Sequence, residues 1–321
     1  MKAKTLLASA LMAALATGVS PMLQAKQATV AVSQIVEHPA LDATRQGLLD
    51  GLKQHGYVEG ENLDFEYKTA QGNPAIAAQI ARQFVGEQPD VLVGIATPTA
   101  QSLASSTRSI PVVFTAVTDP VGAKLVKTLK QPGGNVTGLS DLSPVAQHVE
   151  LIKEMMPSVQ RIGVVYNPGE ANAVSLMALL KRSAAEQGIE IVEATALKSA
   201  DVQSATQVVA GKSDIIYALI DNTVASAIEG MIVAANQAKV PVFGAATSYV
   251  KRGAIASLGF DYYQIGVQTA DYVSQILAGK KPGELDVKVA TGSDLVINQT
   301  AANKLGFTIP QSVLDRATQV E

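Results

Sequence analysis

The chain alternates between two kinds of segment, which differ in how their apolar and polar residues are spaced. Short apolar runs of strand type, such as VLVGIA at 91–96, are followed by stretches in which apolar residues recur at helical spacing, as Leu41, Leu48 and Leu52 do. Strands that alternate with helices in this way predict βαβ units, and therefore parallel sheets with helices on both faces.

The pattern predicts two successive runs of such units, and so an α/β fold with two doubly wound lobes of similar plan. In the first run we expect strands at 28–35, 62–70, 91–96 and 110–117, with helices near 41–52, 75–86 and 101–107. In the second run we expect strands at 161–167, 189–197, 214–221, 240–247 and 254–260, with helices near 173–187, 202–209, 226–238 and 262–277.

The last predicted helix complicates a division into two halves. It follows the final strand of the second run, and we expect it to pack back on the first lobe. The expected division is a signal peptide at 1–25, lobe 1 at 26–141 plus 262–290, and lobe 2 at 142–261 plus 291–321. Such a chain crosses between the lobes more than once, which makes a hinge and places the ligand site in the cleft.

The N-terminus carries the pattern of a secretory signal peptide. Lys2 and Lys4 precede an apolar stretch from Leu6 to Val19, and Ala25 ends the small-residue segment that follows Pro21. The apolar stretch is shorter than the roughly 20 residues that a membrane span needs. The chain has no cysteine, so no lipid can be attached after the signal. We therefore expect an exported, periplasmic protein without a lipid anchor.

Composition excludes several functional classes. The 321 residues are 47% hydrophobic and 17% charged, with a formal net charge of −3 and no basic run, which argues against nucleic-acid binding. Without cysteine there are no disulfides, iron–sulfur clusters or zinc–cysteine sites. His38, His55 and His148 lack metal-ligand spacing, and no HExxH, GxSxG or P-loop motif is present. We expect no metal, no cofactor and no catalytic residue.

The candidate site residues follow the predicted strands, because open parallel sheets bind ligands beyond the carboxyl ends of their strands. Small polar groups dominate in the first lobe, whereas an acid, an amide and aromatic rings mark the second. The candidates are Ser33, Gln34, Thr97, Thr99, Thr115, Ala116, Tyr166, Asp221, Asn222, Thr247, Tyr249 and Phe260.

Two of these candidates have an alternative structural role. Thr97 precedes Pro98 where a helix begins, so its hydroxyl could contact a ligand or simply cap the helix. Asp221 leaves an apolar strand that has little need of an acid, which favours ligand contact, but it could also cap the helix that follows. The aromatic residues each suit a core position singly, and a ligand-facing position as a set at strand ends.

Four segments together resemble a known family. GYVEGENLDFEYKTAQGN (56–73), IPVVFTAVTDP (110–120), QPGGNVTGLSD (131–141) and VVYNP (164–168) are similar to the substrate-binding proteins of bacterial ABC importers, in the branch associated with tryptophan and other aromatic amino acids. The resemblance covers roughly residues 28–315. It implies a type I periplasmic-binding-protein fold, with three crossovers between two lobes that close around a ligand.

The resemblance also implies a function and partners. The matching positions place ligand contacts at Thr97, Thr99, Thr115–Ala116, Asp221 and Asn222. We expect the ligand's carboxylate on the two threonines, its ammonium paired with Asp221, and its side chain among Tyr166, Tyr249 and Phe260. The closed protein would dock on a membrane permease that works with an ATPase, and a monomer is the family expectation.

Alternatives remain open at this point. The same fold can serve a ligand sensor that reports to a receptor, or a periplasmic enzyme, although no catalytic constellation supports the latter. A branched-chain amino acid or a purine-like molecule would also suit a cleft lined by threonine, aspartate and aromatic rings. Only 4% of the residues are aromatic, which limits stacking partners for an aromatic ligand.

Overall fold

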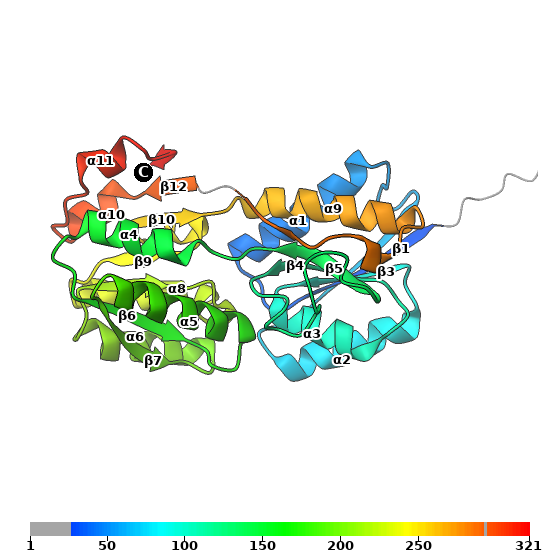
Figure 1. Ribbon diagram of the computed structural model, residues 1–321, viewed down its shortest axis with the longest axis horizontal. Helices are drawn as coiled ribbons and strands as arrows, with labels where there is room; N and C mark the ends of the chain where they lie inside the picture. The colour runs from blue at the N-terminus through cyan, green and yellow to red at the C-terminus, as the bar shows by residue number, and fades with distance from the viewer. Residues whose placement is uncertain (1–26, 292–293) are drawn as a thin grey trace, which may run out of the picture.

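The computed structural model describes residues 27–291 and 294–321, so the expected signal peptide lies outside the described residues. These residues form two α/β lobes side by side, each with its own sheet (Figure 1). We call the part built around the first sheet lobe 1 and the part built around the second lobe 2. No helix in the described ranges has both the length and the apolar character needed to cross a membrane.

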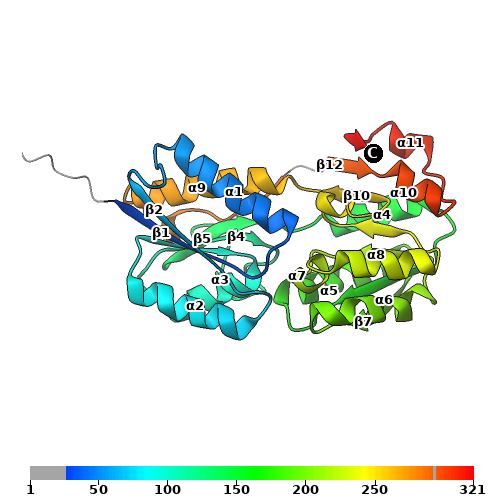
Figure 2. The ribbon, with the colours of Figure 1, turned by 180° about the vertical axis from the view of Figure 1, so that it is seen from behind.

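Lobe 1 contains a parallel sheet with the strand order β11-β5-β4-β3-β1-β2. Helices α1 and α9 cover one face of this sheet, and α2 and α3 cover the other (Figures 1 and 2). The elements are β1 Ala28–Gln34, α1 Pro39–Gln54, β2 Leu63–Thr69, α2 Pro74–Glu87, β3 Val91–Ile95, α3 Thr97–Ser106, β4 Val112–Val117, β5 Val136–Ser140, α9 Tyr262–Leu277 and β11 Lys288–Val289.

Helix α9 lies against α1 at backbone distance, because glycines replace side chains at the contact. A Cβ on Gly266 would lie 2.0 Å from the carbonyl oxygen of Thr44, and one on Gly47 would lie 2.0 Å from that of Tyr263. Segments more than 200 residues apart in the chain are thereby joined in one lobe. Helix α9 begins at Tyr262.

Lobe 2 contains a sheet with the order β13-β12-β10-β9-β8-β6-β7, in which β10 and β12 pair antiparallel and the other neighbours pair parallel. Its elements are α4 Val145–Met155, β6 Arg161–Tyr166, α5 Ala171–Glu186, β7 Glu190–Thr195, α6 Val202–Ala210, β8 Ile215–Ala218, α7 Asn222–Ala225, α8 Ile228–Gln237, β9 Val242–Gly244, β10 Ala256–Gly259, β12 Asp294–Ile297, α10 Gln299–Lys304, α11 Gln311–Leu314 and β13 Gln319–Val320.

Strand β8 shows why the central strands are apolar throughout. Ile215 and Tyr217 belong to the core cluster that includes α4 and α5, whereas Ile216 and Ala218 belong to the cluster that includes α6 and α8. Alternate side chains point to opposite faces of a strand, so a strand buried on both faces needs an unbroken apolar run.

The chain passes between the two sheets three times: from β5 to α4, from β10 to α9, and from β11 to β12. The first two passages are joined by a hydrogen bond of 2.7 Å, which the hydroxyl of Tyr262 donates to Asp141 Oδ2. Both residues are buried at the edge of the cleft.

Several elements differ from the sequence expectation. Helix α3 begins at Thr97 rather than 101, because Ala96 takes a positive φ of 78° and Pro98 fits the first turn of a helix. The helix expected at 226–238 corresponds to α8, and the short helix α7 before it was not foreseen. The short elements after 288 were not foreseen, since strands of two to four residues leave little periodicity.

Candidate ligand-binding site

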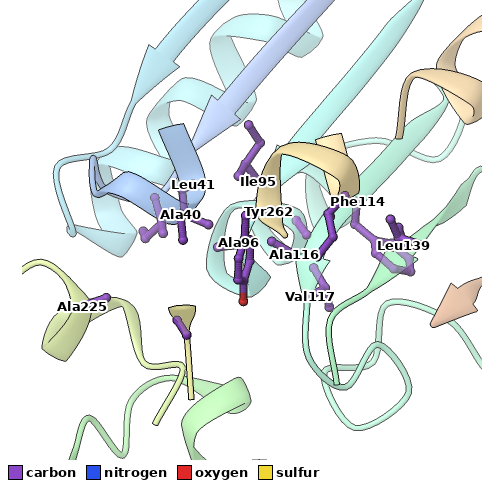
Figure 3. Close-up of a cluster of buried hydrophobic side chains, with 14 of the residues drawn as sticks. Ala40, Leu41, Ile95, Ala96, Phe114, Ala116, Val117, Leu139, Ala225 and Tyr262 are labelled. Carbon is purple, nitrogen blue, oxygen red and sulfur yellow. The ribbon is translucent and has the colours of Figure 1, made fainter. Parts of the chain in front are cut away.

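A narrow cavity lies between the lobes, at the carboxyl ends of the parallel strands. It is lined by His38, Ala40, Leu41, Ala116, Thr118, Asp141, Asn172, Ile220, Asp221, Asn222, Ala225, Ala246, Tyr249 and Tyr262. Figure 3 shows Ala40, Leu41, Ala116 and Tyr262 on the lobe 1 side, with Ala225 of lobe 2 across from them.

Asp221 is a fully buried carboxylate in the lobe 2 wall. It is the N-cap of α7: its Oδ1 accepts from the Val224 amide at 2.9 Å, and its Oδ2 accepts from the Asn167 amide at 2.6 Å. The two roles considered for Asp221 are therefore compatible, because the capping residue also lines the cavity. The backbone bonds hold the carboxylate in one orientation.

A second buried acid, Glu170, lies behind Asp221. Its Oε2 accepts from both the backbone and the side-chain nitrogens of Asn222, and its Oε1 accepts from the amide and hydroxyl of Thr223. Burial, and then the charge of Glu170, raise the pKa of Asp221 well above its usual value. No lysine or arginine is among the described residues that line this cavity, so Asp221 faces it without a protein cation.

Asp141 brings a third carboxylate from the first passage between the lobes. It accepts hydrogen bonds from Tyr262 and, at 3.2 Å, from the hydroxyl of Thr118. Burial raises the pKa of Asp141, and these two hydrogen bonds oppose the rise. Carboxylates from the hinge and from lobe 2 thus meet in one cavity, an arrangement suited to a cationic group.

His38 adds a neutral ring to the lobe 1 wall. Burial lowers the pKa of His38 to about 4, and a hydrogen bond with the side chain of Asn222 only partly offsets this. At neutral pH the ring is uncharged, so it does not supply the missing positive charge.

The rest of the lining is apolar. Leu41 and Ile220 contribute aliphatic surface, while the rings of Tyr249 and Tyr262 are buried with their hydroxyls hydrogen-bonded to the carbonyl of Leu219 and to Asp141. Such a lining suits a ligand with an apolar or aromatic body and a cationic end.

Four residues expected from the sequence line this cavity: Ala116, Asp221, Asn222 and Tyr249. Ala116 lies where the pairing of β4 with β5 shifts register, and its φ is 52°. A non-glycine residue in this left-handed region carries backbone strain of about 1–3 kcal/mol, a feature that clusters at functional sites.

Five more expected residues are buried along the same edge of the lobe 1 sheet, behind the cavity lining. The hydroxyls of Ser33 and Thr97 have no hydrogen-bond partner among the described residues. The N-cap of α3 is Ala96, so the structure contradicts the capping role considered for Thr97. Thr99 donates to the carbonyl of Ile95 at 2.6 Å; Gln34 donates to Val36 and Asp42, and Thr115 accepts from Thr269.

The remaining three expected residues are not brought to the cavity. Tyr166 is half-buried at the end of β6, and Phe260 is buried next to the second passage between the lobes. Thr247 lines a separate surface depression with Lys251 and Tyr263, and its hydroxyl lies 3.4 Å from the carbonyl oxygen of Phe260.

Sequence reasoning missed Glu170 and Asn172, which lie in and just after the loop that follows β6 and resemble solvent-exposed loop residues in the sequence. It also missed Asp141 and Tyr262, although both stand at the expected lobe boundaries. That position was the one signal that could have identified them, because hinge residues face the cleft. Within 27–291 and 294–321, no cluster of three or more potential metal-binding side chains is found.

Comparison with known proteins assigns the family. Residues 29–321 match the family described as ABC transporter substrate binding protein. A tyrosine-binding protein of Clostridioides difficile (strain R20291) is 35% identical over 280 residues, which are 87% of this chain and 81% of the relative.

Solved structures agree with this match. A conserved domain protein of Vibrio cholerae is 82% identical with a TM-score of 0.92, over 92% of this chain and 100% of that one. An ABC domain from Streptococcus pneumonia in complex with L-Trp is 39% identical with a TM-score of 0.89, over the same shares. A ligand-free, open substrate binding protein of Clostridium difficile is 35% identical, covering 92% and 99%, but its TM-score is only 0.69.

The two lobes of this chain are therefore arranged as in the L-Trp complex rather than as in the open protein, at nearly equal identity to both. The type I periplasmic-binding-protein fold implied by the sequence is confirmed. The chain belongs to the ABC transporter substrate binding protein family.

Proposed function

We propose that this protein captures an aromatic amino acid in the periplasm, by closure of its two lobes, and delivers it to an ABC importer. The observation that carries the proposal is Asp221, a buried acid next to a second buried acid, Glu170, in a cavity whose described lining holds no lysine or arginine. A ligand that brings its own positive charge would compensate these acids, and an α-amino acid brings an ammonium group.

The proposed ligand pose uses both lobes. The ammonium lies against Asp221, and the ring packs among Leu41, Tyr249 and Tyr262. The carboxylate is directed to the edge of the lobe 1 sheet, towards the unpaired hydroxyl of Thr97 and the N-terminus of α3.

An aromatic side chain is favoured by the relatives. The curated relative is named for tyrosine binding, and the solved structure that matches the closed arrangement holds L-Trp. Both share at least 35% of their residues with this chain over most of its length.

Location and partners follow from the same proposal. The N-terminal pattern supports export, and the lack of cysteine supports a free periplasmic form rather than a lipid-anchored one. The partners are a membrane permease and its ATPase, and the protein acts as a monomer that binds without chemical turnover.

A thermal-shift panel tests the proposal. The mature chain is refolded to remove carried-over ligand, then heated with each of the twenty amino acids, adenine and several sugars. A ligand at a hundred times its dissociation constant stabilises the fold by about 2.7 kcal/mol, which raises the melting temperature clearly. We expect responses to tyrosine, tryptophan or phenylalanine. A response confined to branched-chain amino acids, to adenine or to sugars would refute the aromatic assignment.

A further inference from the structure

The hydrogen-bonding groups around the cavity are unevenly used. Its hydroxyls already donate to protein acceptors: Tyr249 to the carbonyl of Leu219 at 3.1 Å, and Tyr262 and Thr118 to Asp141. These hydroxyls have no second proton to give to a ligand. Apart from the neutral ring of His38, which carries one N–H, the capacity that remains among the described lining residues is that of acceptors.

Asn172 supplies the clearest of these acceptors. Its Nδ2 donates to Glu170 Oε2 at 3.2 Å and to the carbonyl oxygen of Ile220 at 3.1 Å. The opposite amide orientation would place Oδ1 against two acceptor oxygens, so the hydrogen bonds fix which way the side chain lies. Oδ1 is buried and has no partner among the described residues, although Asn172 is only 3% exposed and lines the cavity.

The position of Asn172 places this acceptor beside Asp221. Its amide is anchored to the residue before Asp221 and to Glu170, the acid whose charge raises the pKa of Asp221. A primary ammonium group carries three N–H donors, so a single carboxylate does not satisfy it. Asn172 Oδ1 is an unused acceptor of a residue that lines the same cavity as Asp221.

We propose that Asn172 is a specificity-determining residue whose Oδ1 accepts a hydrogen bond from the ligand's ammonium group, so that the cavity selects amino acids over the same acids lacking the amino group. The inference rests on the proposed function, which supplies the amino-acid ligand. The phenol or indole group of a ligand could also donate a hydrogen bond to Asn172 Oδ1. Comparing ligands with and without an amino group, and with and without a phenol, separates these donors.

The test compares three ligands in wild type and in Asn172→Ala: L-tyrosine, L-phenylalanine and 3-(4-hydroxyphenyl)propionate, which is tyrosine without its amino group. Affinities are measured by calorimetry, with ligand-observed NMR for weak binding. We expect N172A to weaken both amino acids by about 10- to 100-fold, as for loss of a hydrogen bond to a charged group, and to leave the deaminated acid within twofold.

Leu41→Ala is the matched control. It removes apolar lining on the other side of the cavity and should weaken all three ligands alike, so the ratio of tyrosine to deaminated affinity stays constant. That ratio is the readout, because a general distortion of the cavity would not change it. Thermal unfolding of each empty variant checks that it folds.

Four results decide between these possibilities. An unchanged ratio in N172A overturns the proposal, and so does a loss confined to tyrosine, which would place Asn172 at the ligand's ring. If N172A does not fold, Asn172→Ser is tested in its place, because its shorter side chain withdraws the amide oxygen; an unchanged ratio in that variant overturns the proposal too. Wild type that binds neither amino acid would refute the proposed function itself, whereas binding with an unchanged ratio refutes only the role of Asn172.

Discussion

Ser175→Ala should weaken ligand binding although Ser175 does not line the cavity. Ser175 lies on α5 of lobe 2, and its hydroxyl donates to Asp119 Oδ2, in the loop after β4 of lobe 1, at 3.0 Å. The bond therefore spans the cleft and exists only while the lobes are closed. The structure has the closed arrangement, in which this bond forms part of the contact between lobes.

The magnitude follows from the setting of the bond. Hydrogen bonds to charged groups contribute about 1.5–3 kcal/mol, and both partners here are partly exposed, which favours the lower end. In the variant, Asp119 keeps a second hydrogen bond, which the Gly122 amide donates to Oδ1 at 2.8 Å, so its carboxylate still has a protein donor. A loss of about 1.5 kcal/mol weakens ligand affinity by about tenfold.

Stopped-flow binding and calorimetry of the tightest-binding aromatic amino acid measure this effect. The rate of ligand release should rise about tenfold with little change in the association rate, since the bond forms after the ligand enters. Ser204→Ala is the matched control, because that serine donates at 3.0 Å to the carbonyl of Asp201 within lobe 2. Affinity within twofold of wild type, or a change confined to association, would refute the reasoning.

Three further predictions follow. Asp221→Asn keeps an oxygen to cap α7 but removes the acid, so aromatic amino-acid affinity should fall about 30-fold or more by calorimetry, and an unchanged affinity would contradict the role of Asp221. Its amide nitrogen faces the Asn167 N–H, so the empty variant should also melt at a somewhat lower temperature. Burial lowers the pKa of His148 from 6.5 to about 4, so the unfolded chain takes up the proton first and the free energy of unfolding falls as the pH drops between these values. In denaturant titrations, His148→Gln should reduce this fall by up to about 1.4 kcal/mol per pH unit, and an unchanged slope would count against the prediction. Gly266→Ala should lower the free energy of unfolding by about 1–3 kcal/mol, because the new Cβ clashes with Thr44. Gly86→Ala is the control, because the space around Gly86 in α2 is open, and its free energy of unfolding should not fall. Equal stabilities of the two variants would contradict the close packing of α1 and α9.

Sequence periodicity was sufficient for the two-lobe α/β plan, although it did not predict β5 or α4. Strands buried on both faces, such as β3 and β8, read as apolar runs, and the helices between them keep a clear apolar face. The candidate site was harder to predict, because position after a strand fixes which edge of the sheet a residue joins, not which way its side chain points. Asp221 and Tyr166 both end strands of lobe 2, yet only Asp221 lines the cavity.

The missed residues share a physical cause. Glu170 and Asn172 are polar residues in and next to a loop, and only their burial against Asn222 and Ile220 distinguishes them from solvated surface. That burial depends on how β6 and β8 lie side by side. Asp141 likewise gains its role from Tyr262, which is 121 positions away in the chain.

A crystal structure of the mature protein with its tightest-binding aromatic amino acid would show how the ligand lies in the cavity. We predict closed lobes, with the ligand's nitrogen within about 3 Å of an Asp221 oxygen and of Asn172 Oδ1, and the ring beside Tyr249. A ligand bound outside this cavity, or one whose carboxylate rather than its ammonium faces Asp221, would contradict it.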